Sequence, residues 1–329
     1  MATRHFCTLF DRNYAFKGVA MLRSLFLHCP QAWAHVLCMD DVTLQVLAKS
    51  GLSRITCIAL ADFEDEAMLQ AKKDRNVAEY CWTLTPCLPW YLLQRNPAID
   101  FITYLDADLF FYSPVEPLFA EIGEASVAII EHRFTARLRH LEVNGRFCVE
   151  WVGFRRDSEG LACLERWRSQ CLEWCYARLE DGRMGDQKYL DEWPQRYRAV
   201  HILQHEGAGL APWNFDRYRF DTRPDGAYFV NGVPLVFYHF HQFQILGDGR
   251  FDRLSEYYIA DRREPEAVYQ AYETALRKTM SDVRASVPGF AYGIQTAAHV
   301  TSRRLVQRFV PRPVKEFLRR LMTRFTGVL

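Results

Sequence analysis

The chain has 329 residues, 49% of them hydrophobic, which is enough to bury a large core as one α/β domain or as one domain with an appendage. Its ten cysteines include no Cys-x-x-Cys pair and no cluster with zinc-finger spacing, and its formal net charge is only +1, so we expect no nucleic-acid partner. No signal peptide and no apolar run long enough for a membrane span (about 18 residues) is visible. We therefore expect a cytoplasmic protein with reduced thiols.

The first third of the chain alternates between strand and helix patterns. Strands are predicted at residues 5–10, 35–40 and 54–60, with helices at 15–28 and 42–50 between them. This spacing predicts crossover connections and a mostly parallel sheet, which is an α/β fold. The first strand is followed by LFDRNY, without a Gly-x-Gly-x-x-Gly or Walker-type loop. That absence argues against a dinucleotide-dependent dehydrogenase and a P-loop NTPase.

A helix predicted at residues 79–94, which Pro86 and Pro89 should kink, precedes a buried strand at 101–105. This strand ends in Asp106 and Asp108, which would project to the same side of an extended chain. Two carboxylates at the carboxyl end of a strand suit a divalent cation such as Mg²⁺ or Mn²⁺. An Asp-x-Asp triplet also caps turns and helices, and that interpretation stays open beside the metal site.

Two further motifs follow predicted strands at 126–130 and 147–154 and a predicted helix at 161–176. The first is GDQKYLDEW at residues 185–193, where Asp186 stands at a helix start and could be a simple N-cap. The second is PLVFYHFHQF at residues 234–243, an apolar strand that delivers His239, with His241 as a reserve candidate. Neutral imidazole is a good ligand for Mn²⁺.

Together these motifs resemble those of glycosyltransferases with the GT-A fold, especially family 8, the glycogenin-like enzymes, and related bacterial glycosyltransferases. The resemblance is carried by YLDADLFF (104–111) with the continuation SPVEPLF (113–119), by Gly-Asp-Gln, and by the His-Phe pair after an apolar strand. It covers roughly residues 4 to 245. It implies a GT-A (Rossmann-like, nucleotide-diphospho-sugar transferase) fold with a C-terminal helical extension.

The resemblance also implies roles for individual residues. The metal ligands for Mn²⁺ or Mg²⁺ would be Asp106, Asp108 and His239, and Asp186, assisted by Gln187, would hold the donor sugar or the reacting hydroxyl. The remaining candidates would bind the nucleotide part of the donor, which is expected to be a UDP-sugar: Thr8, Phe10, Asp11, Tyr14, Thr85, Asp106 and Asn214. For Tyr14, packing against the helix start is an equally open interpretation.

The chain departs from the family pattern at two places. The run Trp-Thr-Leu-Thr (82–85) resembles a Trp-Ser-Leu-Thr run of the glycogenin-like enzymes, which often have a lysine just before it. Here Val77 and Ala78 occupy that region, so Arg75 or Lys73 would have to bind the diphosphate instead. In the strand that often carries Asn and Gly near the sugar, Cys148 and Glu150 occupy the corresponding stretch. This second departure puts the identity of the donor sugar in question.

The C-terminal tail differs from the rest of the chain. From residue 300 onward there are eight Arg or Lys against one Glu, a charge of +7, which leaves −6 for the remainder. An apolar stripe (Val314, Phe317, Leu318, Leu321, Met322 and Phe325) lies opposite basic residues of the same predicted helix. Such a helix is typical of a membrane-surface anchor, and packing on the body or on a second copy is the alternative.

These features predict three regions: a GT-A catalytic domain at 1–250, a helical extension at 251–296 and a basic amphipathic tail at 297–329. The expected activity is metal-dependent transfer of a sugar from a nucleotide-diphosphate sugar to a glycan or lipid-linked acceptor, as in bacterial surface polysaccharide or lipopolysaccharide synthesis. The protein would act at the inner face of a membrane and bind its anionic surface through the tail. A nucleotidyltransferase or metal-dependent phosphohydrolase, and a non-catalytic sugar-nucleotide-binding protein, are the alternatives.

Overall fold

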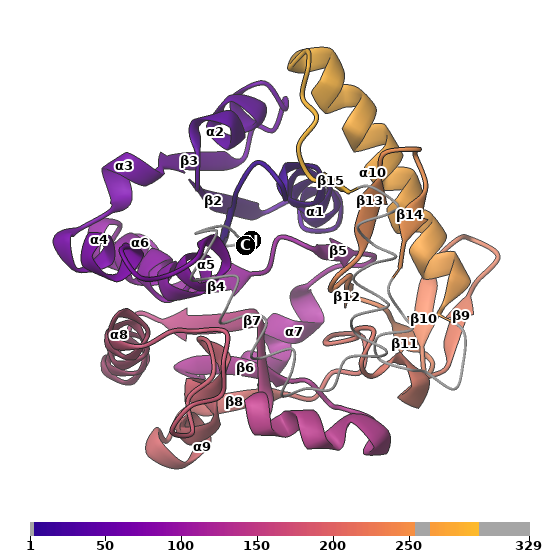
Figure 1. Ribbon diagram of the computed structural model, residues 1–329. Helices are drawn as coiled ribbons and strands as arrows, with labels where there is room; N and C mark the ends of the chain where they lie inside the picture. The colour runs from indigo at the N-terminus through magenta and orange to yellow at the C-terminus, as the bar shows by residue number, and fades with distance from the viewer. Residues whose placement is uncertain (1–2, 254–263, 296–329) are drawn as a thin grey trace.

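A seven-stranded sheet organises the part of the chain that the computed structural model describes, residues 3–253 and 264–295 (Figure 1). Its strand order is β3-β2-β1-β4-β7-β6-β8, in which β1 to β4 run parallel, β7 is antiparallel to both neighbours, and β6 and β8 run parallel. The strands are β1 (Arg4–Phe10), β2 (Ala32–Cys38), β3 (Ile55–Ala59), β4 (Phe101–Leu105), β6 (Val127–Glu131), β7 (Phe147–Arg155) and β8 (Val200–Leu203).

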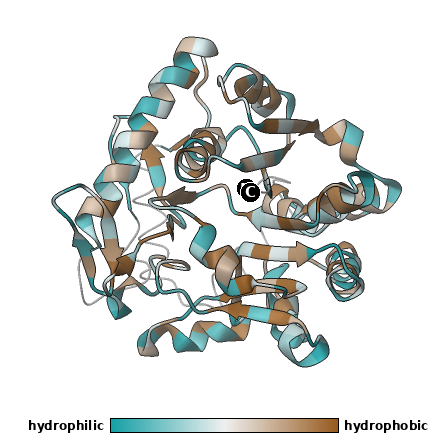
Figure 2. Ribbon diagram, turned by 180° about the vertical axis from the view of Figure 1, so that it is seen from behind, coloured by the Kyte–Doolittle hydropathy of each residue, from teal (hydrophilic) through white to brown (hydrophobic). Residues whose placement is uncertain are grey.

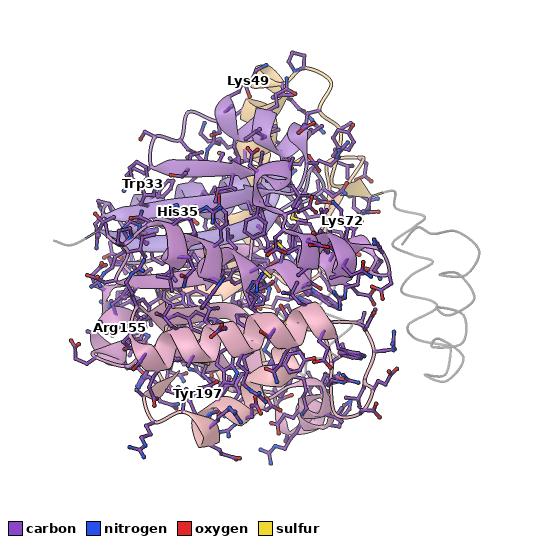
Figure 3. All side chains as sticks on the ribbon, turned by 90° about the vertical axis from the view of Figure 1, so that its left-hand side faces the viewer. Trp33, His35, Lys49, Lys72, Arg155 and Tyr197 are labelled. Carbon is purple, nitrogen blue, oxygen red and sulfur yellow. The ribbon has the colours of Figure 1, made fainter. Side chains whose placement is uncertain are left out.

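Helices cover both faces of this sheet, and the alternation of side chains along β1 shows how the two cores form. Phe6 and Phe10 belong to one hydrophobic cluster, while Cys7 and Leu9 belong to the other. The first cluster includes residues of α1 (Ala15–His28), α2 (Asp41–Ala48) and α7 (Glu116–Ile122). The second includes residues of α4 (Glu66–Lys72), α5 (Val77–Leu84), α6 (Cys87–Arg95) and α8 (Ser158–Glu173). Helix α8 crosses the face turned to the viewer in Figure 3, with Arg155 near one end.

Side-chain caps explain where several of these helices begin. The carboxylates of Asp40, Asp65 and Asp157 accept hydrogen bonds from main-chain N–H groups in the first turns of α2, α4 and α8. Helix α5 starts with a capping box, in which Asn76 and Glu79 each accept from the other's backbone N–H. Short elements complete the body: α3 (Leu60–Phe63), α9 (Trp193–Arg196), and the 3₁₀ helices η1 (Ala136–Asn144), η2 (Gln187–Glu192) and η3 (Phe215–Arg217).

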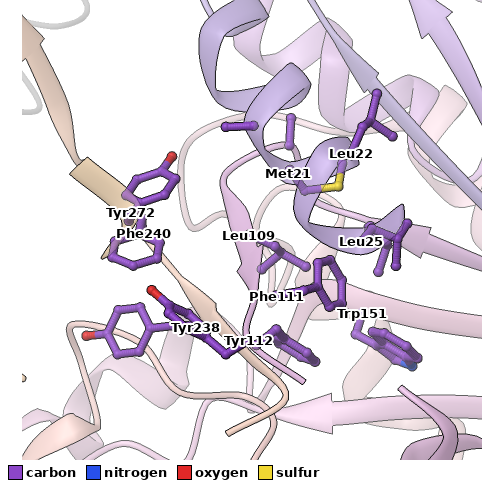
Figure 4. Packing of buried hydrophobic residues seen from close by; sticks show 14 of the residues in the cluster. Met21, Leu22, Leu25, Leu109, Phe111, Tyr112, Trp151, Tyr238, Phe240 and Tyr272 are labelled. Carbon is purple, nitrogen blue, oxygen red and sulfur yellow. The ribbon is translucent and has the colours of Figure 1, made fainter. Parts of the chain in front are cut away.

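Beyond β4 the chain builds smaller sheets beside the large one. Strand β5 (Leu109–Phe111) pairs antiparallel with β12 (Phe237–His239). In Figure 4, Leu109 and Phe111 lie between helix α1 and the strand that carries Tyr238. The other small sheets contain β9 (Phe220–Thr222), β10 (Tyr228–Val230) and β11 (Val233–Pro234), and β13 (Gln244–Leu246), β14 (Phe251–Asp252) and β15 (Ile294–Gln295).

Helix α10 (Glu266–Ser286) packs against α1, beside the small sheet of β13, β14 and β15 (Figure 1). Its buried residues, among them Tyr269 and Tyr272, contact Phe240, whose ring stacks on that of Tyr272 at a centroid distance of 3.8 Å (Figure 4). Figure 2 shows the mixed colouring of this amphipathic helix, with hydrophobic and hydrophilic residues following each other along it. The helical segment after the body is therefore anchored to the first helix of the chain.

The predicted α/β fold with a mostly parallel sheet is confirmed. Helix α1 has the predicted bounds, and the region of Pro86 separates α5 from α6, because Thr85 ends the first helix before the proline begins the second. The apolar strand expected to deliver His239 is confirmed as β12, while Pro234 belongs to the separate strand β11. The extended chain expected to carry on to His241 is wrong, because the chain turns after His239 and Gln242 has φ of +60°. No helix among the described residues is long and apolar enough to cross a membrane. The tail stripe lies outside the described residues.

Candidate functional site

Asp106 and Asp108 flank a turn that links β4 to β5. The N–H of Asp106 donates to the carbonyl of Glu150 on β7 (3.2 Å), and the N–H of Leu109 donates to the carbonyl of Asp106 (3.4 Å). The expectation that the chain is extended here, from which we inferred that Asp106 and Asp108 project to the same side, is therefore wrong, because residues 107 and 108 form a turn. The pairing of β5 with β12, which sets Leu109 opposite His239, nevertheless brings His239 to both carboxylates.

His239 is buried at the centre of this group, and each ring nitrogen faces carboxylate oxygen. Its Nε2 lies 3.0 Å from Oδ1 of Asp108 and 3.8 Å from Oδ2 of Asp106. Its Nδ1 lies 2.6 Å from Oε2 of Glu150. The ring also packs edge-on against Trp213, at a centroid distance of 5.2 Å. The three predicted metal ligands, Asp106, Asp108 and His239, are thus brought together.

The proximity of these groups shifts their pKa values in opposite directions. Burial raises the pKa of Asp106 to about 7, with Asp108 and Glu150 adding to the rise and His239 opposing it. Burial also acts to raise the pKa of Asp108, but the charge and hydrogen bond of His239 outweigh it and hold that pKa well below its usual range. Burial lowers the pKa of His239, yet its acidic neighbours raise the net pKa well above the usual value. Asp108 and His239 therefore form a buried ion pair.

Two sets of potential metal ligands share His239 among the residues that the structure describes. One consists of Asp108, His239 and His241, and the other of Cys148, Glu150 and His239. His241, the reserve candidate, therefore stays near the site although the strand has ended. Burial and the neighbouring His239 lower the pKa of His241 to about 3, so this imidazole is neutral and able to coordinate.

Asp186 is buried immediately before η2, but its side chain makes no capping hydrogen bond. The simple N-cap interpretation is therefore wrong. Burial, followed by the charge of Asp106, raises the pKa of Asp186 to about 7, which places this carboxyl within the electrostatic reach of the metal-ligand candidates. Gln187 lies beside it, and its Nε2 donates to the carbonyl of Asn144 (2.8 Å).

The candidates for nucleotide binding at the first strand fall into two groups. Asp11 shapes the loop by accepting hydrogen bonds from the main-chain N–H of Asn13 (2.9 Å) and Tyr14 (3.2 Å). Tyr14 is 40% exposed as a residue. Desolvation of its hydroxyl, followed by the charges of Asp108 and Asp106, raises its pKa, so the hydroxyl lies near these carboxylates while part of the residue is open to a ligand. Thr8 and Phe10, by contrast, are buried, and the Phe10 ring packs against Gly18 of α1.

Two further candidates are held inside the protein. Thr85 is buried, and its hydroxyl donates to the carbonyl of Cys81 (3.2 Å). Asn214 is fully buried, and its amide accepts from the N–H of Ala211 (3.0 Å) and donates to the carbonyls of His132 (2.8 Å) and Gly209 (2.6 Å). These hydrogen bonds stabilise the loop at residues 209–214, in which the carbonyl of Leu210 accepts the N–H of His239 (2.8 Å). Asn214 therefore has a structural role, and its contact with the nucleotide stays a prediction.

Lys17, which no sequence motif singles out, is a buried residue of α1 whose charge helps to lower the pKa of Asp108. Its ammonium lies 4.5 Å from the centre of the Tyr14 ring. The suggested substitutes for the absent family lysine are engaged elsewhere: Arg75 donates to the carbonyl of Leu172 (3.0 Å), and Lys73 donates to the side chain of Gln70 (2.7 Å). A lysine on the otherwise apolar face of the first helix is the sequence feature that could have indicated a buried charge at the site.

The residues present fit a divalent cation. Asp106 and Asp108 offer hard oxygen ligands and His239 offers an imidazole nitrogen, a donor set that suits Mn²⁺ or Mg²⁺. One oxygen of the neighbouring Glu150, Oε1, is buried without a hydrogen-bond partner among the described residues. An unpaired carboxylate oxygen in such a place is expensive unless positive charge is close by.

Fold and site thus define an α/β protein with a candidate cation centre at the carboxyl end of β4. No family model matches the chain. The chain is 31% identical over 296 residues to the uncharacterized protein YfnD of Bacillus subtilis (strain 168), a similarity that covers 89% of this chain and 95% of YfnD. The chain therefore belongs to the same protein family as YfnD.

Two solved structures are similar at low sequence identity. The glycosyltransferase GlyE of Streptococcus pneumoniae TIGR4 shows 14% identity and a TM-score of 0.49, and the similarity covers 85% of this chain and 64% of GlyE. A complex of the galactosyltransferase LgtC with donor and acceptor sugar analogs shows 14% identity and a TM-score of 0.48, covering 84% of this chain and 95% of LgtC. These similarities concern the fold.

Proposed function

We propose that this protein is a metal-dependent glycosyltransferase that uses a nucleotide-diphosphate sugar, with UDP as the nucleotide. The observation that carries the proposal is the convergence of Asp106, Asp108 and His239 at the end of β4, with Nε2 of His239 within 4 Å of both carboxylates. A cation held by these three side chains would neutralise negative charge on the diphosphate leaving group. The chain's other residues bind and orient the donor around that point.

Tyr14 and Asp186 both lie near the metal-ligand candidates, since the charge of Asp106 adds to the rise in pKa that burial causes at each, and both would contact the donor. Tyr14, partly exposed on the loop after β1, offers an aromatic face to the base of the nucleotide. Asp186 offers a carboxylate that can accept hydrogen bonds from sugar hydroxyls, and it makes no capping hydrogen bond to η2, although it is within hydrogen-bond contact of Thr85. Lys17 supplies a buried positive charge next to Asp108, where a diphosphate would lie.

The acceptor is proposed to be a glycan or a lipid-linked sugar, as in the synthesis of bacterial surface polysaccharide or lipopolysaccharide. The support is the charge distribution of the chain, since the basic tail carries +7 from residue 300 onward against −6 for the remainder. A basic segment favours the anionic cytoplasmic surface of a membrane, where lipid-linked acceptors are found. The protein would then act as a peripheral protein at that surface.

The experiment measures release of free UDP from a panel of UDP-sugars in Mn²⁺, with and without membrane extract. Wild-type protein should release UDP, and Asp108→Asn should not. Asp191→Asn should behave like wild type, because Asp191 pairs with Lys188 (2.8 Å) and accepts from the main-chain N–H of Arg146 (2.8 Å), and neither partner is a candidate metal ligand. Release of UMP with sugar 1-phosphate would instead indicate a phosphohydrolase. Formation of UTP and sugar 1-phosphate only when pyrophosphate is added would indicate a nucleotidyltransferase. UDP binding without turnover of any donor would support a non-catalytic binding protein.

A further inference from the structure

Glu150 is a fully buried carboxylate on β7. It stands in the strand where the glycogenin-like enzymes often have Asn and Gly. Its side chain is 0% exposed, and Oε2 lies 2.6 Å from Nδ1 of His239. The chain behind it leaves little space: a Cβ added at Gly209, whose φ is +74°, would lie 3.6 Å from Oε1 of Glu150 and 2.7 Å from Ile130. The carboxylate is therefore held facing the imidazole.

The main chain of Glu150 holds a second member of the same site. In the antiparallel ladder of β4 and β7, Leu105 is paired with Trp151, and the next step sets Asp106 opposite Glu150. There the carbonyl of Glu150 accepts the N–H of Asp106 at 3.2 Å. One residue thus fixes Asp106 through its backbone and His239 through its side chain.

The contact between Glu150 and Nδ1 of His239 determines which ring nitrogen faces the two aspartates. Because Nδ1–H donates to Glu150, the proton that a cation would displace from the ion-paired ring is the one on Nε2. Its loss would leave the lone pair on Nε2, the atom that faces Asp108 and Asp106. A carboxylate on the far nitrogen of a metal-binding histidine fixes the ring and makes it a stronger donor. An apolar residue at position 150 would leave both the tautomer and the orientation of the ring unspecified.

We propose that Glu150 is a positioning residue of the cation site, which orients His239 and sets the affinity for a divalent cation without itself being a ligand. This inference rests on the cation site of the proposed function. It gives Glu150 a role that does not involve the sugar, so the departure from the family strand pattern does not weaken the site but supports it.

The test compares Glu150→Gln with Glu121→Gln. Glutamine keeps the size of the side chain and can still accept from Nδ1–H, but it removes the negative charge. Glu121 is a matched control because it also accepts from a histidine, His201 at 2.9 Å, and from two main-chain N–H groups, while none of these partners is a candidate ligand. Mn²⁺ affinity is measured by the electron paramagnetic resonance signal of free Mn²⁺, and folding by thermal denaturation.

Glu150→Gln should bind Mn²⁺ about 10- to 100-fold more weakly than wild type, while Glu121→Gln binds it as wild type does. Unchanged Mn²⁺ affinity in a folded Glu150→Gln protein would overturn the inference and leave the proposed function standing. If wild-type protein itself binds no Mn²⁺, the proposed cation site fails, and this inference fails with it.

A second measurement tests the role of Glu150 if the Glu150→Gln variant does not fold. Nitrogen chemical shifts of the histidine rings in ¹⁵N-labelled wild-type protein report which ring nitrogen carries a proton, and loss of one signal set in His239→Gln assigns the ring. In saturating Mg²⁺, His239 should be protonated at Nδ1 and unprotonated at Nε2. The opposite tautomer would contradict the role of Glu150.

Discussion

Asp186→Asn should make the protein more stable at neutral pH while it removes most of its turnover. The Asp186 carboxyl is buried and makes no capping hydrogen bond, and burial together with the charge of Asp106 raises its pKa to about 7. An aspartate in an unfolded chain has a pKa of about 3.9. Ionised Asp186 therefore costs the folded state free energy that an amide of the same shape does not.

The pH dependence follows from the two pKa values. Below about pH 4 the carboxyl is neutral in both states and costs nothing. As the pH rises from about 4 to 7, the unfolded chain releases its proton first, so the folded state loses stability, and above about 7 the loss is constant. A shift of about three pH units corresponds to about 4 kcal/mol, which is the upper limit of the gain expected for Asp186→Asn.

The assay is urea denaturation of wild type and Asp186→Asn at pH 4.5 and pH 8, with UDP release and UDP affinity measured on the same preparations. The variant should be up to about 4 kcal/mol more stable than wild type at pH 8 and only about 1 kcal/mol more stable at pH 4.5, with UDP affinity retained and turnover lost. A variant that is about 1 kcal/mol less stable at both pH values and turns over normally would show that Asp186 is only a helix cap, and would refute the reasoning.

Three further predictions concern other parts of the chain. Lys17→Met should weaken UDP binding in Mn²⁺ about tenfold or more, as loss of a hydrogen bond to a charged group does, and unchanged affinity in titration calorimetry would contradict a place for Lys17 at the diphosphate. Asn214→Ala should lower the free energy of unfolding by at least about 3 kcal/mol, because three buried main-chain groups lose their partner, and a loss below about 1 kcal/mol would be inconsistent with those contacts. Removal of residues 298–329 should abolish sedimentation with anionic vesicles and leave UDP binding unchanged, whereas unfolding or loss of a dimer would mean that the tail is a packing surface.

Local patterns were sufficient to predict the sheet and its connections. Alternating strand and helix signals located β1, α1, β2, α2 and β3, and the apolar run before Asp106 located β4. One helix kinked by its prolines was predicted at residues 79–94, and the structure instead has two helices, α5 and α6, divided at Pro86. The helix start expected at Asp186 is the start of η2. Helices α3 and α4 and the 3₁₀ helices η1 and η3 were not predicted, because each is short and its apolar residues are too few to show a helical period.

The site was predictable only in part, because its remaining members come from long-range pairing. His239 and Asp108 are 131 residues apart, and only the pairing of β5 with β12 shows that their side chains touch. Glu150 lies in the middle of an apolar strand, and nothing local indicates that its carboxylate faces a histidine 89 residues later. The resemblance implied contacts of Phe10 and Asn214 with the nucleotide, which stay predictions, and the structure shows both side chains packed or hydrogen-bonded inside the protein.

The most direct test of the cation site is the anomalous diffraction of Mn²⁺ in crystals of the full chain grown with UDP. A single strong peak is predicted within coordination distance of carboxylate oxygens of Asp106 and Asp108 and of Nε2 of His239, with the UDP diphosphate completing the coordination. A peak at another place in the chain, or bound UDP without Mn²⁺ beside these three side chains, would contradict the assignment of this site.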